Sequence, residues 1–202
     1  MNTLSDDLEI AAAFHGESCP GQVLGVRLAR SGLEKIGITD PAADRKKLIV
    51  FVEIDRCAAD AIMAVTGCRV GKRSLKVIDY GIMAATFLNL ETGRAVRVVA
   101  REESRELAAD YAPDVEGKYE QQRRAYEIMP EDELFRFEEV KVNLKPEDMP
   151  GRPLSRVPCE RCGDYVQDKR EVNTGGEVLC RACAEGGYYR EAPTGINPAT
   201  KS

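Results

Sequence analysis

The sequence has only one histidine, no long hydrophobic run and no excess of positive charge. Its apolar runs are far shorter than the roughly 18–20 residues that a membrane-spanning helix needs. The formal net charge of −5 gives no overall attraction to a phosphate backbone. We therefore expect a chain that neither crosses a membrane nor binds nucleic acid.

Residues 1–8 are acidic and lack the apolar core of a secretory signal. This predicts a cytoplasmic protein. In that compartment the seven cysteines are expected to be metal ligands or reactive thiols rather than structural disulfides. The odd number also argues against complete internal pairing. Cysteine chemistry is thus the main functional signal of the chain.

The first part of the chain predicts helices on either side of one strand. Apolar residues follow a helical period through residues 3–14 and through residues 20–37. The β-branched segment 47–54 favours a buried strand, and a helix over 57–67 should follow it. Two glycines inside the second helix are consistent with close packing at those positions, Gly25 and Gly32.

The next part predicts further strands. Segments 75–80, 84–90 and 95–99 are rich in apolar and β-branched residues, and a hairpin turn at residues 91–93 joins the last two. A charged helical region divided by Pro113 and a strand over 134–144 come next. The expected fold class is α+β, with a mixed, mostly antiparallel sheet and helices packed on it.

Closely spaced prolines mark a linker after the last of these strands. We expect a core domain over residues 1–145, a linker over 146–157, and a small C-terminal domain with its tail over 158–202. Fewer than about 50 residues follow the linker, which is too few for an independent hydrophobic core without a metal or disulfide.

The small domain contains two C-x2-C pairs, Cys159 with Cys162 and Cys180 with Cys183. Their spacing is typical of a zinc site with four thiolate ligands. Such a site has no vacant position, so we expect a structural zinc in a zinc finger. Acidic and basic residues are balanced from Arg156 to Ser202, and the finger therefore lacks the basic surface typical of nucleic-acid binding.

A second cysteine pair lies in the core domain. Cys19 precedes Pro20 at a predicted helix start, and Cys57 begins the helix that follows the first strand. Helix N-termini favour the thiolate, the form that binds metals and attacks electrophiles. Together with His15 these residues could hold zinc or iron with one open position, at which Glu17 or Asp60 could supply an oxygen ligand or transfer a proton.

The alternative is that both cysteines are ordinary buried residues and that His15 only forms a hydrogen bond. Sequence spacing alone does not show that Cys19 and Cys57 meet in space. If they do meet, two neighbouring thiolates make sense mainly as a metal site or as a redox pair.

Several short motifs carry a family resemblance across residues 10–100: Phe14-His-Gly-x-x-Cys-Pro-Gly21, Cys57-x-x-Asp-Ala-Ile62, Thr66-Gly-Cys68, Gly71-Lys72, Asp79-Tyr-Gly81 and Thr92-Gly93. The chain resembles the FmdE family in their order and context. That family is named after the E subunit of the molybdenum- or tungsten-dependent formylmethanofuran dehydrogenase. The four-cysteine finger matches an extension that many members carry.

The resemblance implies an α+β core related in shape to the substrate domain of glyceraldehyde-phosphate dehydrogenase, a treble-clef or ribbon-like zinc finger, and a homodimer. It also places His15, Cys19 and Cys57 at a metal-binding or active site. One position departs from the usual motif, because Glu17 stands where the family has a second histidine. A carboxylate there would offer an oxygen in place of an imidazole nitrogen.

Our first functional hypothesis is a metal-binding accessory or partner subunit of a molybdenum or tungsten redox enzyme of one-carbon metabolism, with redox-enzyme subunits as partners. It would carry zinc in the finger and a second zinc or iron in the core. We recognise no pterin-binding segment and no additional cysteine clusters of the kind that iron–sulfur centres need. Formate-level redox catalysis by this chain alone is therefore not expected.

Two alternatives stay open. The chain could be a stand-alone metal- or thiol-dependent enzyme in which Cys19 or Cys57 is the nucleophile or redox thiol. If His15 is a metal ligand, no second histidine can act as the base, which leaves metal-activated water or thiolate chemistry. The chain could also be a zinc-finger regulator or protein-interaction module.

Overall fold

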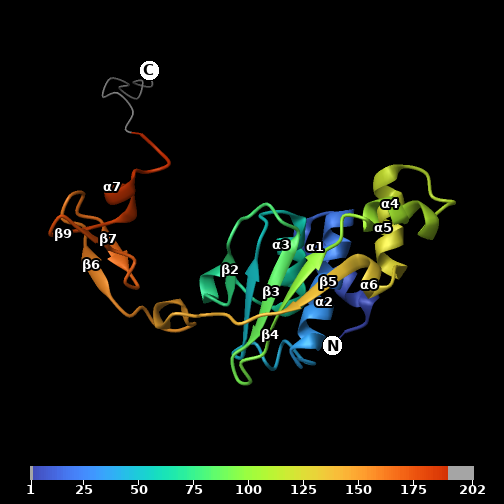
Figure 1. Ribbon diagram of the computed structural model, residues 1–202, viewed down its shortest axis with the longest axis horizontal. Helices are drawn as coiled ribbons and strands as arrows, with labels where there is room; N and C mark the ends of the chain where they lie inside the picture. The colour runs from blue at the N-terminus through green and yellow to red at the C-terminus, as the bar shows by residue number, and fades with distance from the viewer. Residues whose placement is uncertain (1, 191–202) are drawn as a thin grey trace, which may run out of the picture. The chain divides into compact units, whose positions relative to one another are not determined.

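The computed structural model describes residues 2–190, which form two compact units (Figure 1). The core unit consists of the chain up to Lys145 together with Met149–Gly151. The second unit consists of Pro146–Asp148, a single 3-10 turn, and of the chain from Arg152 onward. No described helix is both long and apolar enough to cross a bilayer, and the cytoplasmic location stays a prediction.

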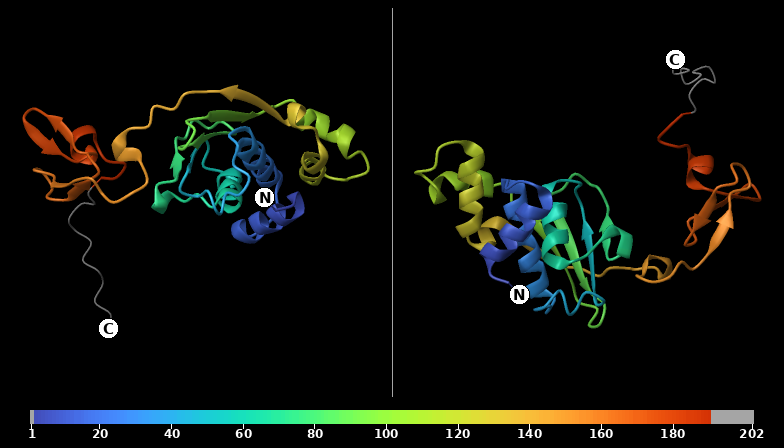
Figure 2. Two further views of the ribbon diagram at one scale, coloured as in Figure 1. Left: turned by 90° about the horizontal axis from the view of Figure 1, so that it is seen from below. Right: turned by 180° about the vertical axis from the view of Figure 1, so that it is seen from behind.

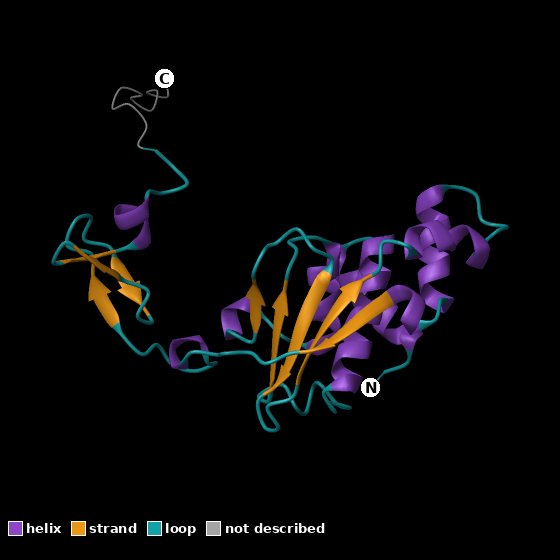
Figure 3. Ribbon diagram, viewed as in Figure 1, coloured by secondary structure: helices purple, strands orange, loops and turns teal. Residues whose placement is uncertain are grey.

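The core unit is built on one five-stranded sheet with the order β2-β1-β3-β4-β5 (Figure 3). The strands are β1 Leu48–Val52, β2 Leu75–Val77, β3 Ala84–Asn89, β4 Ala95–Ala100 and β5 Phe135–Glu139. β1 and β2 are parallel, and the other neighbouring pairs are antiparallel. The predicted mixed, mostly antiparallel sheet is confirmed.

Helices α2 Pro20–Lys35 and α3 Cys57–Thr66 lie on one face of this sheet, and α1 Leu4–His15 packs on these two helices on the side away from the sheet, as the left view of Figure 2 shows. Every second side chain along a strand points to this face of the sheet, where it meets the apolar side of α2. Val50 lies opposite Phe87 and Phe87 opposite Val96, and these three side chains belong to the same buried cluster as Leu28 and Leu33.

The two interior glycines of α2 lie where other elements approach closely. A Cβ atom at Gly25 would lie 2.7 Å from the Cα of Ala58 in α3, and one at Gly32 would lie 2.2 Å from the ring of Phe87. No side chain fits at such distances. The close packing expected at both glycines is therefore confirmed, and at Gly25 it sets the separation of α2 and α3.

The remaining helices of the core are α4 Ser104–Tyr111, α5 Lys118–Ile128 and the short α6 Glu131–Leu134. α4 ends at Tyr111 and α5 begins at Lys118, so Pro113 divides the charged helical region as predicted. Arg27 of α2 reaches the end of α5, where its guanidinium donates to the carbonyl oxygens of Tyr126, Glu127 and Met129 at 2.7, 3.1 and 2.9 Å. These bonds satisfy carbonyls that have no partner inside the helix.

Two predicted strands are shorter in the structure. β2 ends at Val77 because its partner β1 ends at Val52. Beyond β2 the chain turns through Gly81, whose φ is 67°. The predicted strand 134–144 is regular only over Phe135–Glu139, where it pairs with β4. In both cases the apolar pattern continues beyond the neighbouring strand that supplies the hydrogen bonds.

The second unit contains two hairpins followed by one short helix. Its elements are β6 Arg156–Pro158, β7 Tyr165–Gln167, β8 Val172–Thr174, β9 Glu177–Leu179 and α7 Arg181–Glu185. Cys159 and Leu179 are buried there, and most of the other side chains are partly or fully exposed. So small an apolar core cannot stabilise a domain by itself, which is the situation that a structural metal resolves.

Candidate metal sites

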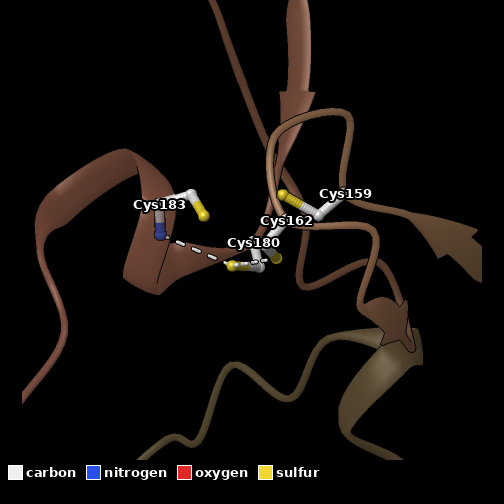
Figure 4. A group of neighbouring side chains, drawn as sticks. All are labelled: Cys159, Cys162, Cys180 and Cys183. Carbon is white, nitrogen blue, oxygen red and sulfur yellow. Dashed lines mark hydrogen bonds between the residues drawn. The ribbon is translucent and has the colours of Figure 1, made fainter. Parts of the chain in front are cut away.

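The four finger cysteines converge on one point (Figure 4). Cys159 and Cys162 lie in the turn after β6, while Cys180 caps the N-terminus of α7 and Cys183 lies in its first turn. Their sulfur atoms all lie within 4.8 Å of one another. Cys162 Sγ and Cys180 Sγ are 3.9 Å apart. Zn–S bonds of about 2.3 Å in a tetrahedron give a sulfur separation of about 3.8 Å. The cluster therefore fits a structural zinc.

The electrostatics of the finger also favour a bound cation. Backbone N–H groups of Cys162 and Cys180 lower the pKa of Cys159 to about 6. The neighbouring sulfur of Cys180 and, to a smaller extent, burial raise the pKa of Cys183 to about 12. Four thiolates at this distance repel one another, so they can ionise together only around a cation. A divalent ion at the centre of the four sulfurs supplies that charge.

A second group of ligand atoms lies in the core unit, where the ends of three helices meet. His15 is the last residue of α1, Cys19 is the N-cap of α2, and Cys57 is the first residue of α3. One nitrogen of His15 and the two sulfur atoms all lie within 4.8 Å of one another, and all three residues are half-buried. The separation is short enough for one shared metal ion.

Local sequence explains this meeting point. Gly16 ends α1 with a left-handed φ of 100°, which turns the chain immediately after His15. Pro20 starts α2 and leaves Cys19 at the cap. The missing side chain of Gly25 lets α3 approach α2 beside Cys57. Each of these signals is local, but only their combination in the folded core brings the two cysteines together.

Asp60 fixes the orientation of the histidine. Its Oδ2 lies 2.8 Å from Nδ1 of His15, and it stands three residues after Cys57 on the same side of α3. A carboxylate at this distance holds the proton on Nδ1, so Nε2 is the nitrogen with a free lone pair. Asp60 therefore lies behind the histidine as an orienting group and outside the three-residue ligand group.

Glu17 is exposed and also lies outside that group. Its role as a ligand or proton-transfer group stays a prediction. The protonation of Cys57 differs from the expectation based on its helix start. Burial and, to a smaller extent, the neighbouring sulfur of Cys19 raise the pKa of Cys57. These two effects outweigh the favourable helix terminus when no cation is present, and a cation between the sulfurs would oppose them.

The fold and the finger define an α+β protein with a C-terminal four-cysteine zinc finger. A family model described as FmdE, Molybdenum formylmethanofuran dehydrogenase operon, matches residues 14–141, and the chain belongs to this family. A second model, the prokaryotic dksA/traR C4-type zinc finger, matches residues 152–189. The family resemblance seen in the sequence is confirmed.

Two relatives extend the comparison. The chain is 30% identical, over an alignment 203 positions long, to a protein of Archaeoglobus fulgidus named "Probable S-adenosyl-L-methionine-binding protein". That alignment covers 92% of this chain but 54% of the relative, so the chain spans about half of its length. The crystal structure of a tungsten formylmethanofuran dehydrogenase FmdE-like protein from Syntrophus aciditrophicus matches with a TM-score of 0.60. The match covers 93% of this chain and 95% of that one at 22% identity, and it supports the fold alone.

Proposed function

We propose that this chain is a metal-binding protein of the FmdE family whose core site binds zinc or iron(II) through His15, Cys19 and Cys57. The observation that carries the proposal is the convergence of their three ligand atoms within 4.8 Å. Three protein ligands leave one position of a tetrahedral ion open, the arrangement found in catalytic rather than structural zinc sites. A metal bound there would polarise a substrate atom or activate a water molecule.

We further propose that the chain works as an accessory or partner subunit of a molybdenum or tungsten formylmethanofuran dehydrogenase-type system. The family name supports this role, since it refers to the operon of that enzyme. In this role the metal site binds or hands over a ligand, and the redox chemistry belongs to the partner subunits.

Metal analysis of the purified full chain tests the core site. Wild type should contain two equivalents of metal, while Cys19→Ser/Cys57→Ser and Cys159→Ser/Cys162→Ser should each contain one. Cys68→Ala is a matched control, because Cys68 is buried outside both ligand groups and should keep two equivalents. Equal metal content in wild type and in the folded Cys19→Ser/Cys57→Ser variant would reject the core site.

The partner role has a separate test. The tagged chain is purified from its native cells, and molybdenum, tungsten and formate-dependent dye reduction are measured in the eluate. Enrichment of either metal together with the activity, relative to an untagged strain, is the expected result. An eluate with the chain at high yield and neither metal enriched would contradict the role.

The name of the Archaeoglobus relative favours a second candidate, the binding of S-adenosylmethionine, because the similarity extends over 92% of this chain. Equilibrium dialysis with radiolabelled S-adenosylmethionine tests it. Saturable binding that is lost in Cys19→Ser/Cys57→Ser would connect this ligand to the core metal. Binding unaffected by that variant would indicate another site, and no binding at millimolar concentration would remove the candidate.

The homodimer implied by the family is also a proposal. The apolar segment 84–90 does not require a partner for cover, because every residue of β3 is buried within this chain. Better support comes from exposed apolar side chains on and after β2: Val77, Ile78, Tyr80 and Ile82. Sedimentation equilibrium at micromolar concentration should give twice the mass of 22.3 kDa, and a monomer would reject the proposal.

A further inference from the structure

We propose that a basic hollow in the core unit binds a small anion with two or more phosphate groups. The hollow has a volume of about 490 Å3 and is lined by Arg45, Lys46, Gly67, Lys72, Ser74, Pro150 and Gly151. This volume lies within the range of roughly 300–1,000 Å3 that is usual for small-molecule sites. The lining includes three cations and no acidic residue, although the whole chain has a net charge of −5.

The three cations come from two loops that are distant in sequence. Arg45 and Lys46 precede β1, and Lys72 ends the 3-10 turn Val70–Lys72 that leads into β2. β1 and β2 are parallel neighbours, so the chain enters both strands at the same end of the sheet. The sheet thus gathers positive charge from both loops at one place.

None of the three cations has a structural role within residues 2–190. Lys47, by contrast, forms ion pairs with two nearby acidic residues, Asp44 at 3.2 Å and Glu91 at 2.8 Å. Arg45, Lys46 and Lys72 are exposed, and in the described part of the chain their side chains form no ion pair or hydrogen bond. They are free to bind a ligand.

The neighbouring Arg69 differs from these three residues, because it stabilises the fold. Its guanidinium donates to the carbonyl oxygens of Met63 and Cys68 near the end of α3 and lies over the ring of Phe14. These contacts supply a cation to carbonyl oxygens at the negative end of the helix. Arg69 is therefore a structural cation of the basic loop 69–73, whereas Lys72 of the same loop is available to an anion.

The arrangement favours a compact multivalent anion. Cations around a hollow can each donate to a different phosphate oxygen, and such charge-assisted bonds are strong in a recess. A nucleic acid would instead require a basic stripe along an accessible surface, whereas this chain is acidic overall. A second hollow lined by Lys35, Arg94 and Lys141 also includes Glu139, and it therefore suits an anion less well.

Isothermal titration of the full chain with fructose 1,6-bisphosphate at low salt tests the proposal. This probe carries two phosphates, and zinc content measured before and after titration verifies that the metals stay in place. Saturable binding is expected, at least about tenfold tighter than that of inorganic phosphate, because a second phosphate engages further cations. Lys46→Gln/Lys72→Gln should weaken binding at least about tenfold.

The matched control is Lys118→Gln/Lys141→Gln, which removes the same charge from exposed positions outside this hollow and should change the affinity less than about twofold. Circular dichroism verifies that both variants are folded. Equal weakening of binding by both variants would overturn the proposal. So would the absence of saturable binding to wild type at about 5 mM probe, because even a site with a millimolar dissociation constant is largely filled at that concentration. Tighter binding of duplex DNA than of the bisphosphate would replace it with a nucleic-acid surface. Each outcome is independent of the core metal site.

Discussion

The ring nitrogen of His15 that carries the proton determines which nitrogen can bind a metal at the core site. Asp60 accepts a hydrogen bond from Nδ1 and so leaves Nε2 as the only nitrogen that can bind a metal. The same carboxylate makes the imidazole a better donor to a cation. In this arrangement His15 cannot also act as a free base, and any proton transfer at the site must involve metal-bound water, a thiol or a carboxylate.

Replacing Asp60 by Ala should weaken metal binding at the core site by about 10–100-fold, because the histidine loses its orienting partner. Competition with a chromogenic chelator measures this affinity once the finger zinc has been accounted for. Asp55→Ala is the control, since Asp55 is exposed and lies outside the ligand group. An unchanged affinity in Asp60→Ala would show that the hydrogen bond to His15 does not support the metal.

At the level of elements, the contact between α2 and α3 determines the geometry of the core site. Gly25→Ala should destabilise the protein by about 1–3 kcal/mol, because the new Cβ overlaps the backbone of Ala58. The cost exceeds the gain of roughly 1 kcal/mol in helix propensity. The displacement of α3 should also move Cys57 away from Cys19 and reduce the metal content.

Gly21→Ala is the matched control. A Cβ there would lie 3.6 Å from Cβ of Cys57 and 4.0 Å from Sγ of Cys19, which are ordinary contacts, although Gly21 is closer to Cys19 in sequence. Urea denaturation should show a change within about 1 kcal/mol for this variant, and its metal content should stay at the wild-type level. Similar losses in both variants would mean that α2 and α3 do not require close contact at Gly25.

A second contact between elements joins α2 to the end of α5 through Arg27. Burial lowers the pKa of this guanidinium, but the group stays charged and donates to three carbonyl oxygens. Arg27→Ala should lower the free energy of unfolding by about 2–3 kcal/mol, because carbonyls at the helix end lose their donor. Arg27→Lys should recover part of the loss, since one ammonium cannot reach all three oxygens as the planar guanidinium does.

Arg105→Ala provides the baseline for that measurement. Arg105 is exposed, and within residues 2–190 its one ion pair is with Glu102, three residues earlier, so its loss should cost less than about 0.5 kcal/mol. Urea unfolding monitored by circular dichroism compares the three variants. If Arg27→Ala were no more harmful than Arg105→Ala, the end of α5 would not depend on α2.

At the level of the whole molecule, the two units should respond differently to metal removal. The finger has almost no buried apolar residues, whereas the core unit has an extensive hydrophobic cluster. Chelation should therefore unfold residues 156–190 and leave the sheet of the core intact. Hydrogen exchange followed by mass spectrometry should show loss of protection in the finger while β1 and β3 stay protected.

The variant Cys159→Ser/Cys162→Ser should reproduce this pattern without chelator. Removal of the core metal alone, in Cys19→Ser/Cys57→Ser, should leave the finger protected. A finger that kept its full protection after complete zinc loss would show that the hairpins are stable by themselves.

The sequence by itself determined the features that depend on neighbouring residues. Two C-x2-C pairs specify a zinc finger, because each pair supplies adjacent ligands in one turn. Glycines in left-handed turns ended α1 and α3 where expected, and runs of apolar and β-branched residues predicted β1, β3 and β4. The lengths of β2 and β5 could not be predicted, since each strand ends where the neighbouring strand in the sheet ends.

Only the tertiary structure decided which distant residues meet. Cys19 and Cys57 could be recognised separately as residues at helix starts, but their approach depends on the packing of α2 against α3 at Gly25. The sequence likewise offered Asp60 as a ligand or acid, and the folded core places it behind His15. The parallel pairing of β1 and β2 is what brings Lys46 and Lys72 to one hollow. A sequence pattern reports on residues within one helical turn or one pair of neighbouring strands. The residues of a site like these come from distant segments, and the packing of whole helices and strands brings them together.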